Sequence, residues 1–243
     1  MLNDIVVAGD KIYQEKNKLV PINFQMHHIL EMFKYFMPKM DLDGSIKLTI
    51  KFAEKPENEA FYNCDKYFRV SWYYVSPDNI QRNATGRDRD LFYVNLLGNI
   101  LKDIAQINEC DDSIIQMIDE TVDKVIGQEF TLVYAVKKLT KTSKDRRYKA
   151  TVLRNLSQNG EKWQLEICAK DGTVLCADLS RDYTHVSQES LYYKAEWQEG
   201  QFIISERLGR VMAIAIPDEG ILQLYSFKGL RDVIALTGKQ DSQ

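Results

Sequence analysis

Two amphipathic stretches between residues 90 and 127 constrain the fold of this chain more than any other feature of its sequence. In both stretches, apolar side chains recur at spacings of three and four residues, which places them on one face of an α-helix. The stripes are formed by Leu91, Val94, Leu97, Leu101 and Ile104, and by Ile115, Ile118, Val122 and Val125. Together they predict a helical hairpin. We expect Asp90 and Asp112 to cap the two helix N-termini, and Gly127 to follow the second helix with a positive φ.

The segments around this hairpin have the residue pattern of β-strands. The clearest strand has apolar side chains at every second position: Ile46, Leu48, Ile50 and Phe52. This period of two predicts one buried and one exposed face. Further strands are predicted at 5–8, 67–75, 130–136 and 148–156. A helix over 25–37 ends at Pro38, which cannot continue the helical hydrogen bonds. The first part of the chain is therefore predicted to be a mixed sheet with three helices.

The second part of the chain has the pattern of an antiparallel β meander. Six short strands are predicted at 163–169, 173–179, 191–197, 201–206, 211–216 and 221–227. Asp171 and Gly172 are typical of a two-residue hairpin turn, and such a turn would place Cys168 and Cys176 on opposite faces of the sheet. Residues 228–238 are predicted to form a short tail with about two helical turns.

These patterns predict an α+β fold, with an α+β domain over 1–156 and an antiparallel β domain over 157–243. The two parts could also form one integrated unit, because the strand at 148–156 fits either side. Residues 1–156 carry 23 Lys+Arg against 22 Asp+Glu, and residues 157–243 carry 9 against 13. The second part is therefore predicted to be mildly acidic.

Composition places the chain among globular proteins with a core of their own. Of its 243 residues, 44% are hydrophobic and 28% are charged, so neither metal nor disulfide bonds are needed for stability. The four cysteines form no C-x-x-C pair, which favours free thiols in a reducing compartment. The N-terminus does not resemble a signal peptide, and no apolar run approaches the ~18 residues of a membrane helix. We therefore expect a cytoplasmic protein that is not embedded in a membrane.

Two short motifs contain residue types that can bind a metal ion or an anion. His27 and Glu31 have the i, i+4 spacing of metal ligands, but a third ligand is needed and His185 is the only histidine outside this helix. We predict a partly exposed helix start there, without metal, and no cofactor elsewhere. Arg87 and Arg89 precede the predicted hairpin and form a weak candidate for anion binding at a helix N-terminus. The glycine pattern of a phosphate-binding loop is missing.

The most basic stretch is 137–147, with six Lys+Arg and the single acid Asp145. Nucleic-acid binding requires aromatic side chains for stacking or a docking motif beside such a stretch. Only Tyr148 is close in sequence. We therefore predict a solvated hairpin tip, and nucleic acid is not the expected partner.

The candidate residues for binding a protein partner are mainly acidic. Carboxylates cluster at the link of the hairpin and along its second helix, and two aromatic residues lie in the acidic second part. They are Glu109, Asp111, Asp112, Asp119, Asp123, Tyr193 and Trp197. Carboxylates steer association with a basic partner, and aromatic residues are enriched at interfaces.

No signature of catalysis accompanies these residues; the G-x-S-x-G motif of serine hydrolases, for example, is missing. The predicted function is a non-catalytic module that binds another protein. An immunity protein that inhibits a bacterial toxin domain with a basic cleft is the specific form of this prediction. The alternative is an enzyme or small-ligand-binding protein with a site between the two parts. A phage or particle structural component is the third possibility.

Overall fold

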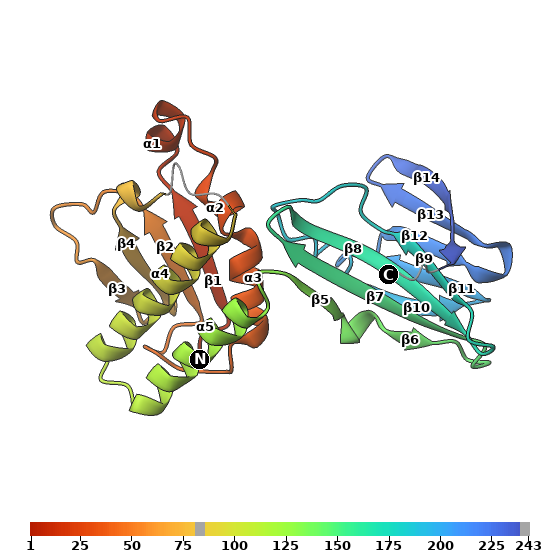
Figure 1. The fold of residues 1–243 in the computed structure, drawn as a ribbon, viewed down its shortest axis with the longest axis horizontal. Coiled ribbons are helices and arrows are strands. Elements are labelled where there is room, and N and C mark those ends of the chain that lie inside the picture. The colour runs from red at the N-terminus through yellow and green to blue at the C-terminus, as the bar shows by residue number, and fades with distance from the viewer. Residues whose placement is uncertain (81–85, 239–243) are drawn as a thin grey trace. The chain divides into compact units, whose positions relative to one another are not determined.

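The computed structural model describes residues 1–80 and 86–238, and confirms the α+β fold. Two compact units divide the chain, Met1–Thr131 and Leu132–Gln243. Figure 1 shows helices only in the first unit, apart from single 3-10 turns, and two sheets of strands in the second. The strand at 148–156, which the sequence allowed on either side, belongs to the second unit.

The first unit contains four strands, five α-helices and one 3-10 helix, labelled η1, among its described residues. In chain order they are β1 (Asp4–Gly9), α1 (Lys11–Lys16), α2 (Ile22–Gln25), α3 (His27–Phe36), β2 (Lys47–Phe52), β3 (Tyr62–Asp65), β4 (Val70–Val75), η1 (Pro77–Asn79), α4 (Gly86–Ile107) and α5 (Asp112–Gly127). The sheet order is β1-β2-β4-β3, with β1, β2 and β4 parallel and β3 antiparallel to β4. The predicted mixed sheet is therefore confirmed.

One face of this sheet packs against the helices. Leu48, Ile50 and Phe52 are almost inaccessible to solvent, as the period of two in β2 predicted. On α4 and α5, Leu101 and Ile118 are fully buried, which confirms the predicted apolar stripes except at Leu91, which is 37% exposed. The two helices approach closely at Gly98, where an added Cβ would lie 2.7 Å from the Cγ2 atom of Val122.

The ends of the hairpin differ from the prediction. Asp90 lies inside α4 and does not cap it, because the helix begins earlier, at Gly86. The side chain of Asp90 is fully buried. Its carboxylate lies 3.1 Å from the Nε2 atom of His28. Asp111 rather than Asp112 is the N-cap of α5. Gly127 is the last residue of α5 and does not have a positive φ; Glu129 and Phe130 do.

Two other elements of the first unit were predicted only approximately. The helix over 25–37 is divided at Met26 into α2 and α3, and α3 ends at Phe36, just before Pro38. The strand over 67–75 begins only at Val70. Tyr67 is 88% exposed in the turn between β3 and β4. Its aromatic side chain was therefore a misleading sign of a strand.

The described residues of the second unit form antiparallel strands and two short 3-10 helices, η2 and η3. They are β5 (Leu132–Ala135), η2 (Lys137–Leu139), β6 (Lys141–Thr142), β7 (Tyr148–Ser157), β8 (Gly160–Ala169), β9 (Val174–Asp178), β10 (Lys194–Gln198), β11 (Gln201–Ser205), β12 (Val211–Ile216), η3 (Pro217–Glu219), β13 (Ile221–Ser226), β14 (Gly229–Ala235) and β15 (Thr237–Gly238). One sheet has the order β10-β11-β12-β13-β14, and the other has the order β15-β9-β8-β7-β5, with β6 also paired to β7. The predicted C-terminal meander is therefore confirmed.

The inward side chains of both sheets form one apolar core. Its largest apolar side chains with no exposure to solvent are Trp163 and Phe202. The tail was predicted to be helical, and this was wrong. It continues the meander as β14 and then crosses to the other sheet as β15, where Thr237 pairs with Cys176. As a strand, β14 pairs with the edge of β13 and satisfies its backbone N–H and C=O groups. A helical tail would leave those edge groups unpaired.

The hairpin between β8 and β9 has a different turn from the one predicted. Ala169 N–H bonds to the carbonyl of Thr173, so the loop contains three residues, with Gly172 at a φ of 91°. The register therefore shifts, and Cys176 pairs with Glu166. Cys168, two residues after Glu166, lies on the same face as Cys176, not on the opposite one. All four cysteines are free thiols.

Candidate interaction surfaces

The structural boundary between the units separates the charges of the chain. Residues 1–131 carry 15 Lys+Arg against 21 Asp+Glu, a net charge of −6. Residues 132–243 carry 17 against 14, a net charge of +3. The sequence-based boundary gave the reverse impression, because it assigned the basic stretch to the first part. The first unit is therefore suited to a basic partner and the second to an anionic one.

The predicted carboxylates form an acidic face on the first unit, defined by Glu109, Asp111, Asp112, Asp119 and Asp123. All five residues are exposed. The spacing of the last three places them on one side of α5, turned away from the side that buries Ile118 and Val122. Asp119 accepts a hydrogen bond of 2.9 Å from Lys102 Nζ on α4, which joins the two helices at the surface.

Glu109 occupies a position that its own chemistry does not favour. It has a φ of 51°, and the N–H of Cys110 bonds to the carbonyl of Ala105. This is the arrangement that glycine usually provides after a helix, because a Cβ is strained at positive φ. A carboxylate also lies unfavourably at the negative end of the helix dipole. Local conflicts of this kind concentrate at functional sites.

We expect Glu109→Gly to raise the free energy of unfolding by about 1 kcal/mol, because glycine adopts the left-handed conformation without the steric cost of a Cβ. Glu109→Gln is the control that removes the charge and keeps the strain, and it should recover only part of this gain. The measurement is urea unfolding of the full chain. A glycine variant less stable than the wild type would contradict the strained-cap interpretation.

A hollow with apolar walls adjoins this acidic link. It has a volume of about 390 Å³ and is lined by Ala60, Phe61, Tyr62, Tyr73, Asp103, Gln106 and Ile107. Phe61 is 61% exposed and Ile107 is 59% exposed, so large apolar side chains face solvent beside the carboxylates. Tyr73 donates a 2.9 Å hydrogen bond to Asp103. Burial and this carboxylate raise the pKa of Tyr73 to about 12, so its hydroxyl remains a donor at neutral pH.

The hollow was not predicted from the sequence. Phe61 lies between a polar loop and the short strand β3, and no periodic pattern includes it. Ile107 follows the apolar stripe of α4 at a spacing of three from Ile104, which is a pattern of burial, yet it lies at the helix end beyond the covered region. Only the pairing of β3 with β4 and the position of α4 bring these residues together.

The weak anion site at Arg87 and Arg89 takes a different form in the structure. Arg87 is exposed, whereas Arg89 turns back to Asp90, whose Oδ1 atom lies 3.3 Å from both Nε and Nη2 of the arginine. Residues 81–85, including Arg82 of the preceding loop, lie outside the described residues. The two arginines are therefore not brought together around one site.

The helix with His27 and Glu31 is also more buried than predicted. Both His27 and His28 have less than a tenth of their surface exposed, so the helix start is not partly exposed. Glu31 pairs with Lys34 at 3.0 Å. No cluster of three or more His, Cys, Asp or Glu side chains suited to a metal ion occurs in the part of the chain that the structure describes.

Tyr193 and Trp197 do not accompany the acidic residues as a separate patch; they lie against the basic stretch. The Nζ atom of Lys138 is 4.5 Å from the ring centroid of Tyr193. Trp197 Nε1 donates a 3.1 Å hydrogen bond to the carbonyl of Lys141, and its ring stacks on Tyr148 with centroids 6.0 Å apart. The sequence indicated Tyr148 alone beside this stretch, and the fold adds two further aromatic residues, Trp197 of β10 and Tyr193 directly before it.

Arg147 is fixed at the edge of this basic stretch by two carboxylates. It pairs with Asp145 through Nε at 2.5 Å and with Asp218 through Nη2 at 3.3 Å. Tyr148 donates a 2.6 Å hydrogen bond to Asp218. Hydrogen bonds from Ser143 and Arg147 lower the pKa of Asp145, and hydrogen bonds from Tyr148 and charge attraction from Arg147 lower that of Asp218. Arg147 is thus a fixed part of the surface, and its charge is compensated locally.

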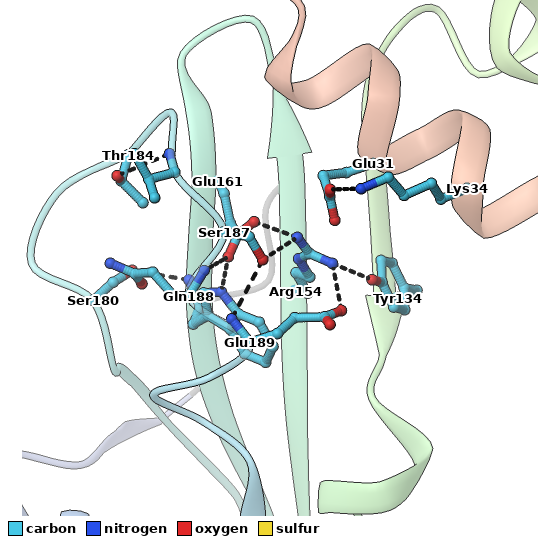
Figure 2. Close-up of polar contacts among 12 residues, drawn as sticks. Glu31, Lys34, Tyr134, Arg154, Glu161, Ser180, Thr184, Ser187, Gln188 and Glu189 are labelled. Carbon is cyan, nitrogen blue, oxygen red and sulfur yellow. Dashed lines mark hydrogen bonds and ion pairs between the residues drawn. The ribbon is translucent and has the colours of Figure 1, made fainter. Parts of the chain in front are cut away.

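A buried ion pair lies inside the second unit, as Figure 2 shows. Arg154 is 2% exposed and Glu161 is inaccessible, and Nη2 of the arginine donates to Oε2 of the glutamate. Arg154 also donates to Glu189 at 2.8 Å, and Glu161 accepts from the backbone N–H of Gln188 at 2.8 Å. The pair thereby attaches the long connection between β9 and β10 to the β7–β8 hairpin. Its role is structural.

The sequence contains a signal for this pair, although no periodic pattern of apolar residues includes it. Arg154 occupies the inward register of β7, between Val152 and Leu156, and Glu161 occupies the inward register of β8, before Trp163. Opposite charges at inward positions of neighbouring strands indicate a buried pair, since an unpaired charge would not be tolerated there.

Within residues 1–80 and 86–238, no helix combines the length and apolar composition needed to cross a membrane. Comparison of the chain with protein-family models, with curated proteins and with solved structures finds no match.

Proposed function

We propose that this chain is a non-catalytic module that binds another protein, and that the acidic face with its adjoining hollow is the interface. The observation that carries this proposal is the exposure of Phe61 and Ile107 in a hollow that Asp103 also lines, with the carboxylates of Glu109 and Asp111 following Ile107 in the chain. Protein interfaces commonly have this construction, in which apolar anchors are surrounded by a polar rim.

The composition of the face defines the partner. From Lys102 to Lys124 the hairpin and its link carry seven acidic residues against two basic ones, so the surface attracts a basic protein. The carboxylates accelerate association and fix orientation, whereas burial of the two apolar side chains supplies affinity. A toxin domain that acts on nucleic acid through a basic cleft belongs to this class of partner. We therefore retain an inhibitor or immunity protein as the specific form of the proposal.

The test is capture of bound proteins from a lysate of the native host, with wild type and two double variants. Asp119→Lys/Asp123→Lys reverses charge on the rigid helix, and Phe61→Ser/Ile107→Ser removes the apolar anchors. We expect a basic protein that the wild type retains at low salt and that both variants lose. Exposed substitutions change stability by only about 0.5 kcal/mol, so the variants should remain folded.

The matched control is Glu15→Lys/Glu54→Lys, which reverses two exposed carboxylates of the same unit outside the acidic face. This control should retain the partner. If all variants capture the same protein at the same salt concentration, the acidic face is not the interface. Turnover of a small molecule by the purified chain, without any captured protein, would support the enzyme alternative.

A further inference from the structure

The basic stretch of the second unit carries an unusual excess of uncompensated charge. Six exposed cations lie within thirteen residues and form no ion pair within 4.0 Å with any described residue. They are Lys137, Lys138, Lys141, Lys144, Arg146 and Lys149. By contrast, Arg147 in the same stretch is paired with two carboxylates. Like charges held close together repel one another, so this surface is most stable when an anion neutralises it.

The local fold holds these cations along one edge of a sheet. Lys137 and Lys138 lie on η2, Lys141 is in β6, and Lys149 is in β7, where it pairs with Thr142. The intervening turn is closed by Ser143, whose N–H bonds to the carbonyl of Tyr148. The cations are therefore presented by hydrogen-bonded backbone and not by a long unstructured loop.

A hollow opens beside this edge. It has a volume of about 470 Å³ and is lined by Ser143, Lys144, Asp145, Trp197, Gln198, Glu199 and Gly200. Tyr193, directly before β10, is 46% exposed and lies under Lys138. The surface thus combines a row of cations with two aromatic side chains that solvent reaches, and one of these lines a concave site.

We propose that this edge binds single-stranded nucleic acid. The row of cations contacts the phosphates, the exposed ring of Tyr193 stacks on an unpaired base, and the hollow beside Trp197 receives a neighbouring base. Proteins that bind single strands without sequence preference combine these two features, because every base can stack on an aromatic ring while the backbone follows a basic groove. This inference is independent of the function proposed for the first unit.

The aromatic residues favour a nucleic acid over an acidic protein segment. An acidic segment needs only the charges, whereas bases also use the aromatic rings. A single strand fits better than a duplex, because the bases of a duplex are stacked on one another and cannot reach Tyr193 or the hollow beside Trp197.

The test is fluorescence anisotropy of the full chain with a labelled twelve-nucleotide oligo(dT). Two probes accompany it: an abasic strand of the same length and poly-glutamate of equal charge. We expect a Kd of about 10 µM or tighter for oligo(dT) at low salt, with weaker binding as salt rises. Lys141→Gln/Lys144→Gln/Arg146→Gln should weaken binding at least tenfold and reduce the slope of log Kd against log salt by about 2.

The control variant Arg207→Gln/Arg210→Gln/Lys228→Gln removes three exposed charges from the same unit at other positions, and it should bind nearly as the wild type does. Tyr193→Leu tests the stacking separately. It should weaken oligo(dT) binding about fivefold or more and leave the abasic strand unaffected.

Three results would overturn the proposal. The first is the absence of binding at 100 µM protein, a concentration about tenfold above the expected Kd. The second is equal loss of binding in both triple variants, which would show that only net charge matters. The third is binding of poly-glutamate as tightly as oligo(dT), which would assign the surface to an acidic protein.

Discussion

Replacing Glu161 with leucine lowers the free energy of unfolding by about 3–5 kcal/mol, because it leaves the guanidinium of Arg154 buried without its main counter-charge. Arg154 is 2% exposed, so water cannot take the place of the lost carboxylate. The same change removes the acceptor for Trp163 Nε1 and for the backbone N–H of Gln188. The measurement is urea unfolding of the full chain, followed by far-UV circular dichroism.

The double variant Arg154→Met/Glu161→Leu separates the pair from its surroundings. If the loss in Glu161→Leu comes from an orphaned charge, removing both charges should restore most of the stability, because apolar replacement of a buried pair is often neutral. The matched control is Arg147→Met, which breaks two ion pairs whose side chains are about half exposed. It should leave the unfolding midpoint nearly unchanged. Equal losses in Glu161→Leu and in the double variant would show that packing, not charge, dominates.

This pair also illustrates what the sequence could and could not show about the fold. The alternation along β7 and β8 was strong enough to predict both strands, and the helical stripes predicted α4 and α5. Such patterns are local, because they repeat within a single element. The periodicity of an element does not specify which other element it packs against or pairs with, so the order of the strands could not be predicted from the sequence.

The candidate surfaces depended on that missing information to different degrees. The acidic face was predicted because its residues are close in sequence and α5 alone arranges them. The contact between Lys138 and Tyr193 joins residues more than fifty positions apart, and it arises only when β10 lies beside η2. The same is true of the hollow between Phe61 and Ile107. Surfaces built by one element could be predicted, and surfaces built by several could not.

Turn chemistry explains the smaller errors. Asp171 and Gly172 fit both a two-residue and a three-residue hairpin loop, and the two loops differ by one residue in register. A shift of one residue moves a side chain to the opposite face of the sheet. The faces of Cys168 and Cys176 were therefore predicted incorrectly, although the hairpin itself was predicted correctly.

Leu101→Ala will lower the free energy of unfolding by about 2–5 kcal/mol, the largest effect expected in the first unit. Leu101 is inaccessible to solvent at the centre of the α4 stripe. Truncation removes three side-chain carbons, one methine and two methyl groups, from the core and leaves a cavity that α5 cannot fill by moving closer. Helix α5 already lies as close to α4 as packing allows at Gly98, where Val122 Cγ2 lies 2.7 Å from the position that a Cβ would occupy. The measurement is again urea unfolding of the full chain.

Leu91→Ala is the control for this change, because it makes the same substitution in the same helix at a residue that is 37% exposed. Leu91 belongs to the same sequence stripe, so periodicity alone predicts similar losses for both variants. Burial predicts that Leu91→Ala changes stability by only about 0.5 kcal/mol. Similar losses in the two variants would contradict the packing of α4 described here, since they would require Leu91 to be buried as deeply as Leu101. A large difference would show that burial, and not the helical pattern alone, determines the contribution of each leucine.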